Sequence, residues 1–253
     1  MSNRVLIAPH PNMFKISENL NRDELKKSFE KDKNITIAPF LDEESADKMH
    51  EFFYYDMPEG WWSTSTLSGE DSKEYEKTSP LHLRRLKGNM ELISQSCQKA
   101  QDSFVKGKFS YIFDRTQDDH HEGCECLECH FREFLKSPDM ISLVNEITGS
   151  DIETSGEVFA SRYKAGHFLS PHHDMNKGKV GFVYSLTKDW RPQWGGNLYI
   201  LEDDYTTIKK TVLSTYNRLV MFDIPSQNGI PHFVSHVVNQ VPYSRTSITG
   251  WFH

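Results

Sequence analysis

Residues Tyr163–Asp174 read YKAGHFLSPHHD and end in a His-x-Asp motif formed by His172 and Asp174. In an extended strand, residues two apart point to the same side of the chain. The His172 imidazole and the Asp174 carboxylate can therefore face one point, while His173 faces away. Imidazole nitrogens and carboxylate oxygens are common metal ligands. A histidine near an aspartate also occurs in solvated turns and in buried hydrogen-bonded pairs, so the motif indicates a metal centre only together with ligands from elsewhere in the chain.

The sequence that follows Gly149 consists of short runs rich in β-branched and aromatic residues, with turn residues between them. These runs are EVFASRYKAGHFLSPHHD, KVGFVYSLT, GGNLYILED, KKTVLST, NRLVMFDIP, HFVSHVVNQ and RTSITGWFH. So many candidate strands within about a hundred residues favour a β-sandwich or a β-barrel.

The first half of the sequence carries mostly helical patterns, with apolar residues three and four apart and capping residues at the ends. The predicted helices span Asn21–Asp32, Asp42–Phe53, Asn89–Gly107 and Pro138–Thr148, and NITIAPF from Asn34 to Phe40 predicts a short strand. Residues Glu59–Pro80 are rich in Ser, Thr, Gly and charge, so we expect a long surface loop there. We predict one α+β domain over residues 1–253, mainly helical in 1–150, with a β core in 151–253 and the helices packed on one face.

Composition narrows the class of protein. The 253 residues are 37% hydrophobic and 26% charged, which is typical of a globular chain. The net charge of −7 argues against a nonspecific nucleic-acid binder, which would usually present a basic face. No apolar run approaches the length of a membrane span, and the N-terminus shows no pattern of a signal peptide. With only four clustered cysteines in addition, we expect a cytoplasmic protein with no membrane partner.

Two further residues in the β-rich half extend the metal hypothesis. His236 lies on another candidate strand, and Arg245 follows it by nine residues. Two histidines and one carboxylate on one face of a metal leave coordination positions open, as in non-haem Fe(II) oxygenases. The planar guanidinium of an arginine can hold a carboxylate through two hydrogen bonds. The combination predicts a metal centre beside a binding site for a carboxylate.

The region from about Phe131 to His253 resembles the 2-oxoglutarate- and Fe(II)-dependent dioxygenases, and among them the prolyl hydroxylase branch. The similarity rests on YKAGHFLSPHHD, WGGNLYI, NRLVMFDI and HVVNQVPYSRTSITGWFH. The ending SITGWFH is similar to that of the ribosomal-protein prolyl hydroxylases in particular. The resemblance implies a double-stranded β-helix (jelly roll) core. It offers no counterpart for a cysteine cluster that lies further upstream.

The resemblance also implies roles for individual residues. His172, Asp174 and His236 would bind the iron, Arg245 would hold the distal carboxylate of 2-oxoglutarate, and Tyr163 would be a second contact to it. Ser247 or Thr249 would line the same pocket, and spacing does not choose between them.

Two positions compete with these ligands. His173 is also adjacent to Asp174, but it would face the other side of the strand. His232 lies four residues before His236, so the two could share a strand face. The offset to Arg245 and the valines that follow favour His236.

The implied activity is hydroxylation of an unactivated C–H bond, with release of succinate and CO2. The substrate that the resemblance favours is a prolyl residue in a protein. It would require Fe(II), 2-oxoglutarate and O2. Asp174 is present, where halogenating relatives have a small residue, so we expect hydroxylation. One alternative is a hydroxylase of a free amino acid or other small molecule, and another is a non-catalytic jelly-roll binding module. The substrate partner is accordingly a protein or a small molecule, and the sequence predicts no oligomeric state.

A second metal-binding pattern lies in HHEGCECLECH, residues His120–His130. Thiolates and imidazoles suit Zn(II), whereas thiolates at a dioxygen-activating iron would themselves be oxidised. We therefore expect a structural zinc, if any metal, bound by Cys124, Cys126, Cys129 and His130, with His120 or His121 as alternatives for the histidine. The other interpretation is a reduced polar loop that leads into a helix.

Overall fold

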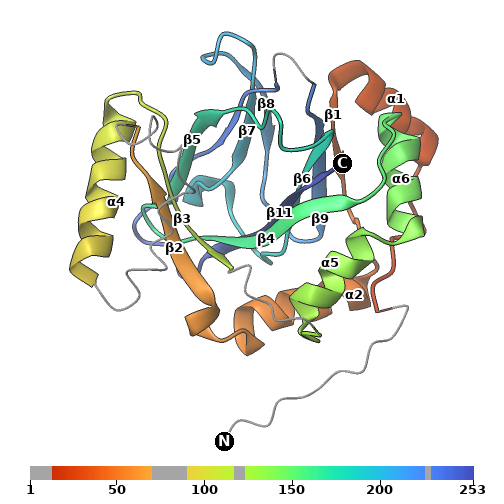
Figure 1. The fold of residues 1–253 in the computed structure, drawn as a ribbon, viewed down its shortest axis with the longest axis horizontal. Coiled ribbons are helices and arrows are strands. Elements are labelled where there is room, and N and C mark those ends of the chain that lie inside the picture. Colours follow the sequence, from red (N-terminus) through yellow and green to blue (C-terminus); the bar gives the residue numbers. More distant parts are fainter. Residues whose placement is uncertain (1–12, 70–89, 117–122, 226–228) are drawn as a thin grey trace, which may run out of the picture.

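A computed structural model describes residues 13–69, 90–116, 123–225 and 229–253. Every strand pairing is antiparallel, and the strands join in one sheet that curls around a central interior (Figure 1). The strand order is β1-β9-β6-β11-β4-β3-β5-β10-β7-β8, with β2 paired to β3. The strands are β1 Asn34–Ile37, β2 Trp62–Leu67, β3 Tyr111–Thr116, β4 Ser155–Tyr163, β5 Phe168–His172, β6 Val180–Ser185, β7 Leu198–Leu201, β8 Ile208–Val212, β9 Arg218–Asp223, β10 His232–Val234 and β11 Arg245–Phe252. The predicted α+β jelly roll is confirmed.

The strands alternate between two hydrophobic layers, as the period of two requires. On β11, Ile248 and Phe252 belong to the core between the sheet and the helices, whereas Trp251 belongs to the core inside the curled sheet. Aromatic side chains such as Phe113 and Phe159 fill much of that inner core. The inner faces of the strands therefore enclose an aromatic interior, and polar side chains placed there are shielded from water.

The helices cover the outside of the sheet. They are α1 Arg22–Asp32, α2 Glu43–Glu51, α4 Met90–Val105, α5 Leu127–Leu135 and α6 Pro138–Thr148. Buried residues of α1, α2, α5 and α6 share one core with the outer faces of β4, β6, β9 and β11. In contrast, α4 contacts β2 and β3 and lies on the opposite side of the molecule from α1 and α6 in Figure 1.

Local capping explains where the predicted helices begin and end. The Asn21 side chain accepts a hydrogen bond from the Glu24 amide at the start of α1, and Asp42 caps α2 in the same way. Ser137 caps α6, which ends at Gly149 with a φ of 68°, a left-handed conformation that glycine adopts without strain. The structure thus confirms these helices to within a few residues.

The N-terminal half contributes more to the sheet than the sequence pattern indicates. Residues 62–67, inside the predicted surface loop 59–80, form β2, while residues 70–80 of that loop lie outside the described residues. The strand β3 lies between β4 and β5, in the middle of the sheet. The β core therefore extends beyond residues 151–253, and β1, β2 and β3 complete it. No helix in the described part of the chain is long and apolar enough to span a bilayer.

Candidate metal centre

Three side chains come together where β5 and β10 pair. His172 ends β5, Asp174 follows two residues later, and His232 begins β10 directly opposite His172. The Nε2 atoms of His172 and His232 lie 3.6 Å from Oδ1 and Oδ2 of Asp174 respectively. One ligand atom from each residue lies within 4.8 Å of the other two. The group offers two nitrogens and a carboxylate to one ion.

Backbone carbonyls orient both imidazoles. The Nδ1 atom of His172 lies 2.9 Å from the Ser170 carbonyl oxygen, and Nδ1 of His232 lies 3.0 Å from the Ile230 carbonyl oxygen. Because a carbonyl oxygen only accepts, each Nδ1 carries a proton, and each Nε2 faces an oxygen of Asp174. Metal-binding histidines are commonly held in this way.

The protonation states also suit a divalent cation. Burial and the neighbouring His232 lower the pKa of His172 to about 4, so its imidazole is neutral at neutral pH. Burial alone would raise the pKa of Asp174, but His232, His172 and a hydrogen bond from Trp251 leave it below its usual value. That bond joins Trp251 Nε1 to Asp174 Oδ2 at 3.1 Å. The neutral imidazole of His172, the imidazole of His232 and the carboxylate of Asp174 fit Fe(II) bound on one face.

The structure corrects the choice of the distal histidine. His236 lies beyond the end of β10, and its ring stacks on Phe168 and meets Phe104 edge-on, with both centroid distances at 4.3 Å. It does not belong to the group formed by His172 and Asp174, in which His232 takes its place. The reason is that the strand stops at Val234, so residues 232 and 236 do not share a strand face. His173 is also outside the group, as its opposite orientation predicts.

Arg245 begins β11 and is almost completely buried, at 2% exposed. Its guanidinium carbon lies 4.9 Å from the ring centroid of Tyr163, its partner across the β4–β11 ladder. Its Nε donates to Ser214 Oγ at 2.8 Å. Burial lowers the pKa of Arg245, and no carboxylate of the described residues forms an ion pair with it. A buried cation without an anionic partner is costly, so this arrangement is prepared for an anionic ligand.

The remaining predicted pocket residues lie near Arg245. Tyr163 is buried in the inner core, and burial raises the pKa of its hydroxyl group. Ser247 and Thr249 share a face of β11 with Arg245 by the two-residue period. The Ser247 hydroxyl is 3.0 Å from the Ser161 hydroxyl on β4, which leaves it engaged within the sheet.

Sequence reasoning considered His232 but preferred His236, and it did not identify Trp251 as the donor to Asp174 or Ser214 as the partner of Arg245. The alternation of β11 could have indicated that Trp251 faces the same interior as Arg245. Nothing local marks Ser214, because its contact with Arg245 joins residues from distant parts of the chain.

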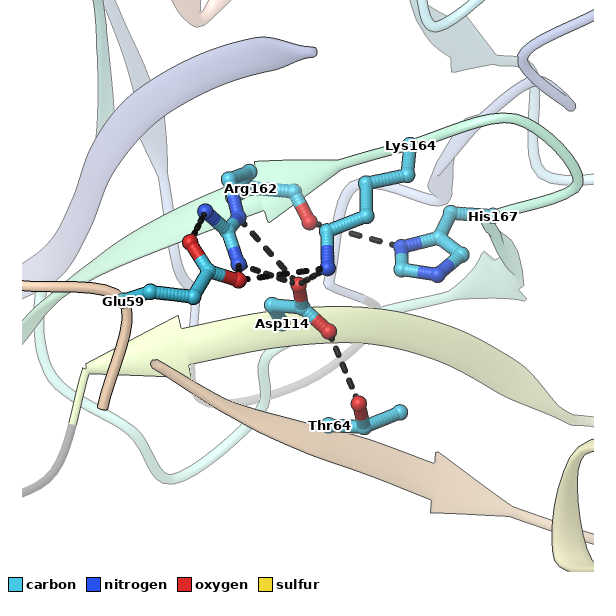
Figure 2. Close-up of polar contacts among 6 residues, drawn as sticks. All are labelled: Glu59, Thr64, Asp114, Arg162, Lys164 and His167. Carbon is cyan, nitrogen blue, oxygen red and sulfur yellow. Dashed lines mark hydrogen bonds and ion pairs between the residues drawn. The ribbon is translucent and has the colours of Figure 1, made fainter. Parts of the chain in front are cut away.

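A network of charged residues, also absent from the sequence-based predictions, joins β2, β3 and β4 (Figure 2). Arg162 and Lys164 donate to Asp114 Oδ2 at 2.9 and 2.7 Å, and Arg162 also contacts both carboxylate oxygens of Glu59. Thr64 Oγ1 donates to Asp114 Oδ1 at 2.9 Å. Arg162 precedes Tyr163 and points to the opposite side of β4, so this network supports the strand from outside.

The sequence and the structure were compared with those of known proteins. Residues 158–253 match the family described as the 2OG-Fe(II) oxygenase superfamily, and a search of curated proteins gives no match. A prolyl-4-hydroxylase from Pseudomonas putida is 16% identical, with 94% of this chain and 97% of that chain covered and a TM-score of 0.51. A prolyl hydroxylase from Trichoplax adhaerens, in complex with a hypoxia inducible factor oxygen degradation domain peptide fragment, is 17% identical, with coverage of 91% and 88% and a TM-score of 0.58. A 2OG-Fe(II) oxygenase family oxidoreductase from Burkholderia pseudomallei is 11% identical, with coverage of 94% and 92% and a TM-score of 0.58.

At these identities the solved structures show the fold alone. The family match covers His172, Asp174, His232 and Arg245, all of which lie within residues 158–253. This region is therefore similar to the 2OG-Fe(II) oxygenases, and that similarity implies Fe(II) and 2-oxoglutarate as cofactor and co-substrate. The donor set found here fits that ion, and the buried Arg245 fits a carboxylate ligand.

Proposed function

We propose that this 2OG-Fe(II) oxygenase hydroxylates a prolyl residue of a protein substrate and releases succinate and CO2. The observation that carries the proposal is that the inner faces of the strands hold both the His172, Asp174 and His232 group and the buried cation of Arg245, which has no ion-pair partner among the described residues. The similarity of YKAGHFLSPHHD and SITGWFH to prolyl hydroxylases supports the choice of substrate.

The side chains divide the work between two ends of the site. His172, Asp174 and His232 would hold Fe(II), and Arg245 would hold the distal carboxylate of 2-oxoglutarate. Bound Fe(II), with 2-oxoglutarate and O2, supplies the oxidation that converts a C–H bond to an alcohol. Ser214 and Tyr163 restrict the direction of the Arg245 guanidinium and so orient the co-substrate.

Aromatic rings shield the metal end of the site. The Phe222 ring centroid is 4.7 Å from that of His232, and the Phe109 centroid is 5.6 Å from that of His172. Such walls exclude water, which strengthens the electrostatic contacts inside and limits side reactions.

The test measures co-substrate turnover and substrate oxidation together. Purified protein with Fe(II), 2-oxoglutarate and O2 would be incubated with a library of proline-containing peptides, and succinate would be followed over time. We expect peptide-dependent succinate formation and a gain of one oxygen atom on proline, located by fragmentation mass spectrometry. Asp174→Ala should abolish both signals.

Two outcomes would contradict the proposal in different ways. Succinate formation triggered by free amino acids and not by peptides would assign a small-molecule substrate to the same oxygenase. No binding of 2-oxoglutarate to the Fe(II)-loaded protein would leave a non-catalytic jelly-roll module.

A further inference from the structure

Three cysteine thiols gather outside the proposed oxygenase site, around the N-terminus of α5. Cys126 is the N-cap residue of α5, Cys129 lies in the first turn of that helix, and Cys124 precedes it by two residues. Their sulfur atoms all lie within 4.8 Å of one another, and each residue is partly buried. None of the four cysteines is in a disulfide. Within residues 124–129, the backbone thus brings three thiol sulfur atoms close together.

The three sulfur atoms lie close enough together for one ion to contact all of them. Neighbouring thiols oppose ionisation because each new thiolate repels the next, and a divalent cation reverses this effect. Cys97, the fourth cysteine, lies on α4 and outside the group, so it serves as an internal control.

The donor chemistry selects the ion. Thiolate sulfur is the preferred ligand of Zn(II) in structural sites, usually in fours and with tetrahedral geometry. His130 follows Cys126 by four residues, on the same side of α5, and its buried Nε2 atom has no hydrogen-bond partner in the part of the chain that the structure describes. His130 is not within the three-sulfur group, so the three thiols define the site. A nitrogen or oxygen atom would be the fourth ligand of the ion.

We propose that Cys124, Cys126 and Cys129 bind a structural Zn(II) that is separate from the oxygenase metal centre. Binding replaces the thiol protons, so up to three protons leave for each ion bound. The ion joins the segment before α5 to the first turn of that helix. The same turn carries Glu128, whose Oε1 accepts a hydrogen bond from Thr116 Oγ1 at the end of β3. The site therefore fixes how α5 follows β3.

The first experiment measures zinc directly, without reference to activity. Protein purified without chelators would be analysed for metal content as the wild type and as His172→Ala, Cys126→Ser, Cys129→Ser and Cys97→Ser variants. We expect about one zinc per chain in the wild type, His172→Ala and Cys97→Ser, and loss of that zinc in the other two. Circular dichroism would show whether each variant is folded.

A second measurement tests the proposal on the wild-type protein, in case the cysteine variants do not fold. X-ray absorption at the zinc edge of the wild-type protein should show three sulfur ligands and one nitrogen or oxygen ligand. Zinc that is retained in Cys126→Ser and Cys129→Ser but lost in His172→Ala would overturn the proposal. So would a zinc shell without sulfur, or wild-type protein that binds no zinc after incubation with excess Zn(II) under reducing conditions.

Discussion

His232 lies directly opposite His172 in the antiparallel pairing of β5 and β10, and their ring centroids are 4.3 Å apart. The two imidazoles of the candidate metal centre therefore come from the pairing itself, and Asp174 lies just beyond the end of β5. Directly after His232 the β5–β10 register shifts before Val234. The position of both imidazoles consequently depends on one cross-strand pair, and the residues after His232 do not continue the same register.

The first prediction distinguishes the two candidate distal ligands. His232→Ala should weaken Fe(II) binding by about 100-fold or more, because an imidazole of the metal group is lost. His236→Ala should leave Fe(II) binding unchanged but lower the free energy of unfolding by about 1–3 kcal/mol, since its ring packs on Phe168 and Phe104. Anaerobic titration with Fe(II) and 2-oxoglutarate, followed by the visible charge-transfer band, measures the first effect. Urea unfolding measures the second, and loss of the band in His236→Ala alone would restore His236 as the ligand.

The second prediction concerns Arg245 as the anchor for 2-oxoglutarate. Arg245→Met keeps much of the side-chain volume but removes the cation, so 2-oxoglutarate affinity should fall by at least about 30-fold, or about 2 kcal/mol. Ligand-induced thermal stabilisation of the Fe(II)-loaded protein measures this without turnover. Unchanged stabilisation by 2-oxoglutarate in Arg245→Met would show that the co-substrate carboxylate binds elsewhere.

Ser214→Ala tests the orientation of Arg245 separately from its charge. It removes the hydroxyl that accepts from Arg245 Nε at 2.8 Å, but it leaves the guanidinium charge in place. A hydrogen bond to a charged group contributes about 1.5–3 kcal/mol, and only part of it acts through the orientation of Arg245. The loss of 2-oxoglutarate affinity should therefore be smaller than in Arg245→Met. An equal loss in both would mean that orientation, and not charge, dominates the contact.

The sequence predicted local relationships well and long-range ones poorly. His172 and Asp174 are two apart, so strand geometry alone placed them together. The distal histidine was chosen by counting back from Arg245, and that count assumes regular structure through residues 235–244. In the structure β10 ends at Val234, and His236 leaves the strand to pack against Phe168. The spacing between two residues in the sequence does not show where a short strand ends.

The position of β3 was hidden for a different reason. Its sequence, YIFDRT, places a charged residue on each face, Asp114 on one and Arg115 on the other, so no simple alternation of apolar and polar residues marks the strand. Asp114 is tolerated there only because Arg162 and Lys164 approach it from β4 and the turn after it. The partners that make the burial of this carboxylate favourable lie about fifty residues away in the sequence.

A third prediction tests the hydrogen bond between Trp251 and Asp174. Trp251→Phe keeps an aromatic ring in the inner core but removes the Nε1 donor at 3.1 Å, and Fe(II) affinity should fall by about 10–100-fold. Trp190→Phe is the matched control, since its Nε1 donates to the Gly195 carbonyl at 2.9 Å and not to a metal-binding residue. Metal titration without 2-oxoglutarate compares the two. Equal Fe(II) affinities in both variants would remove Trp251 from the metal centre.

The last prediction concerns Asp114 and the pH dependence of stability. Burial alone would raise the pKa of Asp114, but Lys164, His167 and Arg162 leave it below its ordinary value (Figure 2). A carboxyl whose pKa is lowered in the folded state stabilises the fold above its unfolded pKa of about 4, and this contribution is lost as the pH falls through the folded value. Asp114→Asn should thus cost about 3 kcal/mol near pH 7, and the difference from the wild type should shrink below about pH 4.

Urea unfolding of both proteins between about pH 7 and pH 3 measures this difference directly. Thr64→Val is the matched control, because it removes only the hydrogen bond from the Thr64 hydroxyl to Asp114 Oδ1 at 2.9 Å and leaves the charges in place. Its cost should be about 1.5 kcal/mol, the lower end for a hydrogen bond to a charged group, and nearly independent of pH above the pKa of Asp114. If the Asp114→Asn difference were constant over the whole range, the carboxylate charge would contribute nothing. The attachment of β2 and Glu59 to the sheet would then rest on packing, such as that of Arg162 over the Trp62 ring at 4.5 Å.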